Sequence, residues 1–103
     1  MEIKLQKNNS SLLVTVDGKI DTNTAVDFGQ TIIDNLDDTV DNLVIDFAKV
    51  AYISSMGLRM LLECQKTMKA KNGDMKLMNV QYAVMEVLEM TGFVKILKII
   101  NYD

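Results

Sequence analysis

The chain has 103 residues, of which 49% are apolar and 24% are charged, and its formal net charge is −3. This length allows one domain with one core, so we expect a single domain over residues 1–103. The acidic balance argues against nucleic acid as a partner. No apolar run approaches the roughly 20 residues of a membrane span. The lone Cys64 and an N-terminus without a signal pattern indicate the cytoplasm.

Two strands are expected at the start of the chain. Residues 2–7 alternate apolar and polar side chains, and Leu12, Val14 and Val16 occupy one face of a second strand. The segment 8–10 between them, Asn-Asn-Ser, is a turn signal. Such a short connection favours an antiparallel hairpin.

A helix and a strand follow the hairpin. Residues 21–24 supply several candidate N-caps, and apolar residues then recur at helical spacing from Ala25 to Leu36. The polar segment 37–42 ends this helix. Residues 43–47 are almost entirely apolar, which is typical of a central strand covered on both faces.

The second half of the chain repeats the alternation of helix and strand. A helix with an apolar stripe from Leu58 to Met68 is expected to end at Gly73, which suits a left-handed position after a helix. A strand over 75–80 and a third helix closed by Gly92 come next, and residues 94–100 suggest a last strand. Strands separated by single helices run parallel through right-handed crossovers. We therefore expect an α/β fold with a mixed sheet of four to five strands packed with helices.

Several kinds of chemistry are absent from the sequence. The chain has no histidine, which removes the commonest general base, and one cysteine without histidine cannot supply a zinc site. The five glycines form no phosphate-binding loop. We expect no enzyme activity, no metal and no cofactor. A catalytic Ser55 with a lysine base is the enzyme alternative, and no recognisable motif supports it.

Two consecutive serines stand where the second expected helix begins. Ser54 and Ser55 follow the apolar strand that ends near Phe47 and precede a helix that is under way by Leu58. Serine is a favoured N-cap because its oxygen accepts an orphan backbone N–H. One serine is enough for that task. On the residues alone, both hydroxyls could be structural, or one of them could carry the function.

Three segments of the chain resemble a known family in order and spacing. They are GKIDTNTA over 18–25, LVIDFAKVAYISSMGLRMLL over 43–62 and MKLMNVQYAVMEVLEMTGFVKILKI over 75–99. The chain resembles STAS domains, and in particular the stand-alone anti-sigma factor antagonists of bacteria. The resemblance implies a small cytoplasmic binding protein of STAS-like fold. Its implied partner is an anti-sigma factor that is also a serine kinase, and binding this partner frees a sigma factor to direct transcription.

The resemblance also implies a switch. In this family the kinase phosphorylates one serine at the start of the helix after the central strand, which releases the partner, and a serine phosphatase reverses the modification. The family pattern is often Asp-Ser-(Ser/Thr/Ala)-Gly-Leu, and here it reads Ser-Ser-Met-Gly-Leu over 54–58. Ser55 falls at the phosphoacceptor position. Ser54 replaces the frequent aspartate and is the fallback acceptor.

The family's G-x-[IL]-D block places an acidic residue, here Asp21, in a loop beside the phosphoacceptor. The alternative is that Asp21 only caps the following helix. The partner-binding residues implied by the resemblance are Asp21, Thr22, Asn23, Thr24, Ser54, Ser55, Met56, Gly57 and Arg59. The alternative function is a STAS interaction module that is not phosphorylated, in a lipid-transport, anion-transport or stress-signalling complex, with Ser55 as a cap only.

Overall fold

The computed structural model describes residues 1–101, which form five strands and three α-helices. In chain order the elements are β1 Glu2–Asn8, β2 Ser11–Asp17, α1 Ala25–Ile33, β3 Asn42–Lys49, α2 Ser55–Ala70, β4 Asp74–Met78, α3 Tyr82–Met90, the 3-10 helix η1 Phe93–Lys95, and β5 Lys98–Ile100.

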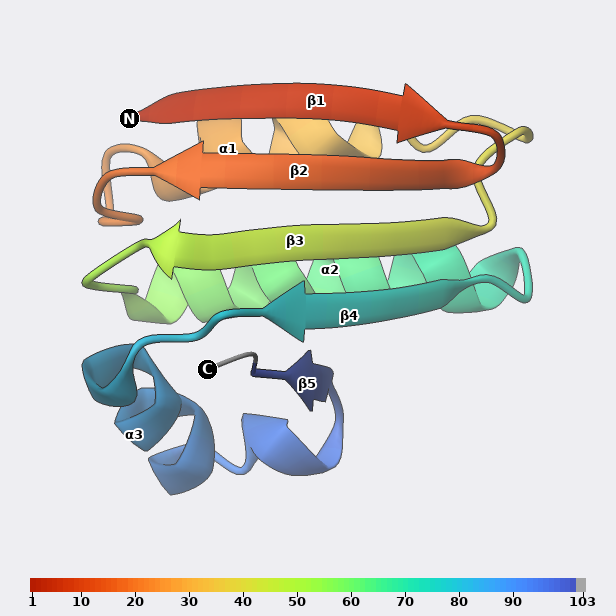
Figure 1. Cartoon of the computed structure of the whole chain (residues 1–103). Coiled ribbons are helices and arrows are strands. Elements are labelled where there is room, and N and C mark those ends of the chain that lie inside the picture. The colour runs from red at the N-terminus through yellow and green to blue at the C-terminus, as the bar shows by residue number, and fades with distance from the viewer. Residues whose placement is uncertain (102–103) are drawn as a thin grey trace.

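The five strands make one mixed sheet in the order β1-β2-β3-β4-β5 (Figure 1). β1 and β2 are antiparallel, and the later strands are parallel neighbours, each joined through a helix. The predicted hairpin is confirmed. Asn8 pairs with Ser11, and Asn9 between them adopts a positive φ of 57°, which asparagine tolerates better than most residues. The predicted α/β fold class is therefore correct.

The sheet is covered on one face only. Both α1 and α2 lie behind the sheet in Figure 1, and no helix formed by residues 1–101 crosses the front. In β3 the side chains of Leu43, Ile45 and Phe47 are buried, whereas Val44 and Asp46 between them are half-buried. The expectation of a central strand covered on both faces was therefore wrong. An apolar run alone does not specify how many faces are covered, because that depends on where the connecting helices pack.

The ends of two helices differ from the sequence-based expectation. α1 ends at Ile33, three residues before the last apolar position of its stripe, because the chain turns at Asp34. After α2 the left-handed residue is Asn72 (φ 59°), not Gly73. Gly73 is instead held close to its neighbours: a Cβ there would lie 2.6 Å from the Met68 methyl carbon and 3.0 Å from the Asp41 carbonyl oxygen.

The last strand is shorter than the apolar run that suggested it. Residues 93–95 form η1, and only Lys98–Ile100 pair with β4 as β5. Gly92 ends the α3 segment with a φ of 80°, as its position after the third stripe predicted. α3 lies beyond the β4 side of the sheet, at the lower left of Figure 1, and η1 lies to its right, below β5. This placement brings the start of η1 close to α2, which matters for the surface described below.

Candidate functional site

Two loops meet at the start of α2. Ile20, in the loop after β2, forms an isolated parallel bridge with Ile53, in the loop after β3. The Ile20 N–H donates to the Tyr52 carbonyl at 3.0 Å, and the Ser54 N–H donates to the Ile20 carbonyl at 2.8 Å. These bonds fix the loop that carries Asp21 beside the first turn of α2. The structure therefore brings together two segments that lie more than thirty residues apart in the sequence.

Gly57 allows this close approach. A Cβ at Gly57 would lie 2.7 Å from Cγ1 of Ile53 and 2.8 Å from Cγ2 of Ile20, which are the two residues of the bridge. Both distances are well below van der Waals contact for carbon. The first turn of α2 consequently packs directly on the bridge between the loops, and any side chain at this position would push them apart.

The two serines have different roles in the local structure. Ser54 is the N-cap of α2, in the extended conformation (φ −86°, ψ 170°), and its Oγ accepts a hydrogen bond from the Gly57 N–H at 3.1 Å. Its side chain is buried, with 8% exposure. Ser55 is the first residue of α2 and is exposed, and its hydroxyl has no hydrogen-bond partner within residues 1–101. The capping requirement is thus met by Ser54 alone.

The Asp21 loop is closed on itself by hydrogen bonds. Oδ1 of Asp21 accepts from the backbone N–H groups of Asn23 (2.9 Å) and Thr24 (3.0 Å) and from the Thr24 hydroxyl (3.2 Å). The Thr24 hydroxyl in turn accepts from the Asp21 N–H at 2.9 Å. Partial desolvation acts to raise the pKa of the Asp21 carboxyl, but these bonds and the nearby Lys19 charge outweigh it, so the pKa lies below its ordinary value.

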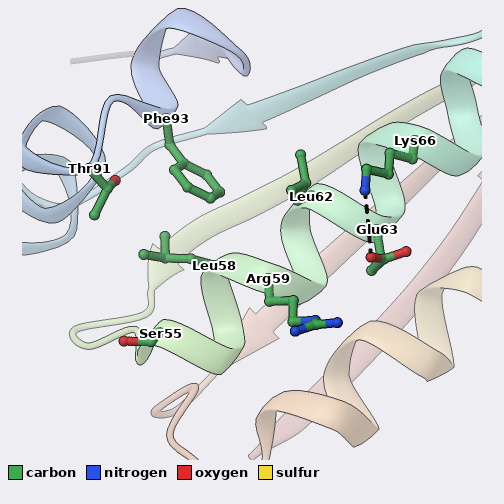
Figure 2. A pocket seen from close by; sticks show the side chains of 8 residues that line it. All are labelled: Ser55, Leu58, Arg59, Leu62, Glu63, Lys66, Thr91 and Phe93. Carbon is green, nitrogen blue, oxygen red and sulfur yellow. Dashed lines mark ion pairs between the residues drawn. The ribbon is translucent and has the colours of Figure 1, made fainter.

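A shallow groove of about 420 Å³ runs along α2 from its first residue (Figure 2). Leu58 and Leu62 form part of its apolar surface, and the ring of Phe93 from η1 points toward them. Thr91 closes the groove at the α3 side. The full lining is Ser55, Leu58, Arg59, Leu62, Glu63, Lys66, Thr91 and Phe93.

The predicted site residues fall into an exposed set and a buried set. Thr22, Asn23, Ser55, Met56 and Arg59 are exposed around the meeting point of the two loops, and Asp21 and Thr24 are half-buried there. Ser54 and Gly57 are buried, and each has the local structural task described above. Of the exposed set, Ser55 and Arg59 also line the groove along α2.

Sequence reasoning did not find the whole of this surface. Tyr52 is 50% exposed in the loop that leads to α2, and Thr91 and Phe93 line the groove from a distant part of the chain. An aromatic residue two positions before the first of the two serines was a usable signal for Tyr52. No local pattern marks Thr91 or Phe93, because their place depends on how α3 and η1 dock beside α2.

Within residues 1–101, no three acidic or cysteine side chains converge as metal ligands would. Over the same residues, no helix combines the length and the apolar composition needed to cross a bilayer.

The five-stranded sheet, the helices on one face and the exposed serine at the start of α2 define a small α/β domain of the STAS type. The STAS domain family model matches residues 2–102, and the chain belongs to this family. BtrV of Bordetella bronchiseptica, named as a candidate anti-sigma factor antagonist, is 27% identical over 101 residues, which cover 98% of this chain and 87% of BtrV.

Solved structures with a similar fold are more distant in sequence. A candidate anti-sigma factor antagonist from Thermotoga maritima superimposes with a TM-score of 0.90 at 18% identity, covering 97% of this chain and 86% of that one. The anti-sigma factor antagonist SpoIIAA in its unphosphorylated form gives 0.85 at 15% identity, covering 99% and 89%. The Bacillus cell fate determinant SpoIIAA in its phosphorylated form gives 0.74 at 15% identity, covering 99% and 92%.

Proposed function

We propose that this protein is an anti-sigma factor antagonist that phosphorylation of Ser55 switches off. The observation that carries the proposal is that the two serines at the start of α2 have different structural roles. Ser54 satisfies the helix cap, which leaves the neighbouring Ser55 exposed with a free hydroxyl. The relatives named as anti-sigma factor antagonists, and the existence of SpoIIAA in a phosphorylated form, support the same function.

The proposed partner is an anti-sigma factor that is also a serine kinase. It binds the exposed region formed by the Asp21 loop and the first turn of α2, and this binding releases a sigma factor to direct transcription. The kinase transfers the γ-phosphoryl group of ATP to Ser55 Oγ. An O–P bond forms, ADP leaves, and the hydroxyl proton is released. A serine phosphatase hydrolyses the phosphoserine and restores the binding form, and all of these steps take place in the cytoplasm.

The fold tolerates this modification better than the interface does. A helix N-terminus offers unpaired N–H groups and partial positive charge, so a phosphate at Ser55 suits α2. The same phosphate adds about −1.5 to −2 charge at the surface that the partner must cover. One like-charge contact near 4 Å costs about 4 kcal/mol at an effective dielectric of 20, which is enough to release a partner.

The experiment that tests the proposal maps the phosphorylated residue. The protein is incubated with its cognate kinase and ATP and then analysed by mass spectrometry, with Ser55→Ala and Ser54→Ala as matched variants. We expect phosphate on Ser55 in the wild type and in Ser54→Ala, and none in Ser55→Ala. Phosphate only at other positions, or full incorporation in Ser55→Ala, would contradict the assignment. An absence of phosphate in every protein would favour a STAS module without this switch.

A further inference from the structure

Arg59 lies four residues after Ser55 in α2, and the two side chains line the same groove. Residues at this spacing share one face of a helix, with Cβ atoms about 5–6 Å apart. In the unmodified protein, the Arg59 guanidinium extends along the helix away from the Ser55 hydroxyl (Figure 2). A change of rotamer is enough to bring the guanidinium back over the first turn, since the side chain is exposed.

Arg59 is not committed to another acidic group. Among residues 1–101 it forms no ion pair, and Glu63, the acidic residue that lines the groove, pairs with Lys66 at 4.0 Å instead. The order of the charged residues along the helix explains why Glu63 does not pair with Arg59. A pair four residues apart is more favourable with the acid N-terminal to the base, and Arg59 precedes Glu63. A phosphate on Ser55 would precede Arg59 and have the favourable order.

We propose that Arg59 is the phosphate ligand of phosphorylated Ser55. The inference rests on Ser55 as the acceptor in the proposed function. The guanidinium folds back along α2 and donates two N–H hydrogen bonds to phosphate oxygens, a geometry that arginine forms with phosphate more readily than lysine does. Lys66 lines the same groove but stands eleven residues from Ser55, about 16 Å along the helix axis, which is too far for contact.

This contact gives phosphorylation a second effect on the partner. Arg59 belongs to the exposed surface around the meeting point of the loops, where a free cation is available to the partner's acidic or carbonyl groups. When the phosphate binds Arg59, that cation is withdrawn at the same time as negative charge is added. Lys19 and Asp21 are charged residues of the loop beside the first turn of α2, and the Asp21 carboxylate is already held by the N–H groups of its own loop.

The test uses the full-length protein with phosphoserine incorporated at position 55 during translation, so that no cognate kinase is needed. A ³¹P NMR titration gives the second pKa of the phosphate, which is ordinarily about 6. The comparison includes Arg59→Gln, Arg59→Lys and the matched control Lys66→Gln. We expect Arg59→Gln to raise this pKa by about 0.3 pH unit, the size expected for one such pair on a helix. Arg59→Lys should give a smaller rise, and Lys66→Gln should leave the pKa unchanged.

A pKa that is the same in Arg59→Gln and in the wild type would overturn the proposal, as would an equal rise in Lys66→Gln. The phosphorylation-mapping experiment fails or succeeds independently of this titration, because the titration requires neither kinase nor partner. If the second pKa of the phosphate is unchanged in Arg59→Gln, the proposed Arg59 contact is wrong, and the proposed switch at Ser55 is not affected. If the cognate kinase does not phosphorylate Ser55, the proposed switch is wrong, whatever pKa values the titration gives.

Discussion

The starts of α1 and α2 lie side by side, yet they use their polar side chains differently. Before α1, the Asp21 carboxylate and the Thr24 hydroxyl satisfy one another and the N–H groups of their own loop. Before α2, buried Ser54 provides the cap, and the next residue, Ser55, keeps a free hydroxyl at the surface. The loop before α1 is closed by its own hydrogen bonds, whereas the start of α2 leaves the Ser55 hydroxyl oxygen available. Adjacent hydroxyl residues can therefore separate a structural task from a functional one.

The largest expected effect on stability concerns the contact between the first turn of α2 and the loop before α1. Gly57→Ala places a Cβ against Ile53 and Ile20, so the loops must move apart. Overpacking of this kind costs about 1–3 kcal/mol, and the better helix propensity of alanine offsets about 1 kcal/mol. We expect a net loss of stability in urea denaturation, with Lys66→Ala on the exposed face as the control. A Gly57→Ala protein more stable than the wild type would show that the close approach is not required.

The next effect separates the two serines. Ser54→Ala removes the cap of α2 and should destabilise the protein by about 1 kcal/mol, or about 4–8 °C in melting temperature. Ser55→Ala changes an exposed side chain without a partner and should stay within about 0.5 kcal/mol of the wild type. Thermal melts of the two variants, which differ only in position, test this directly. Equal losses in both would mean that the capping role is shared.

The smallest expected effect on stability concerns the Asp21 loop before α1. The depressed pKa of Asp21 means that its carboxylate form is favoured by the fold. The resulting stability is present at pH 7 and is lost as the pH falls below the ordinary carboxyl value of 3.8 toward the folded-state pKa. We therefore expect Asp21→Asn, which keeps an oxygen acceptor, to melt slightly lower than the wild type at pH 7, with a difference that shrinks as the pH is lowered below 3.8. A difference that stays constant or grows as the pH is lowered would contradict this origin.

Asp21→Asn also tests recognition. The expectation that Asp21 caps the helix was wrong, because the N-cap of α1 is Thr24 and the Asp21 carboxylate bonds within the preceding loop. Because asparagine keeps an oxygen for these bonds, a decrease in the rate of phosphorylation by the cognate kinase would assign the Asp21 charge to partner binding. Unchanged kinetics would leave Asp21 with its structural role in the loop alone.

The sequence predicted most of the elements because their periodicity is local. The hairpin at Asn8–Ser11 and the helix that begins at the serines were both correct. The one-sided covering of β3 was missed, since an apolar strand fits a sheet covered on one face or on both. The assignment of the cap to Ser54 was also out of reach, because either serine obeys the same preference and only the backbone conformation at Ser54 separates them. Phe93 lines the groove because η1 packs beside α2, and no local sequence pattern predicts this tertiary contact.

Calorimetry with the cognate anti-sigma factor tests the central claim most directly. Wild type, Ser55→Ala, Ser55→Asp and stoichiometrically phosphorylated protein are compared, with thermal melts to verify folding. Aspartate suits a helix N-terminus, so Ser55→Asp should fold normally. It should bind at least about tenfold more weakly than wild type, a loss of about 1.4 kcal/mol, and the phosphorylated protein more weakly still. Ser55→Ala should bind as wild type does and no longer respond to ATP. Binding by Ser55→Asp and by the phosphorylated protein as tight as that of the wild type would contradict the switch.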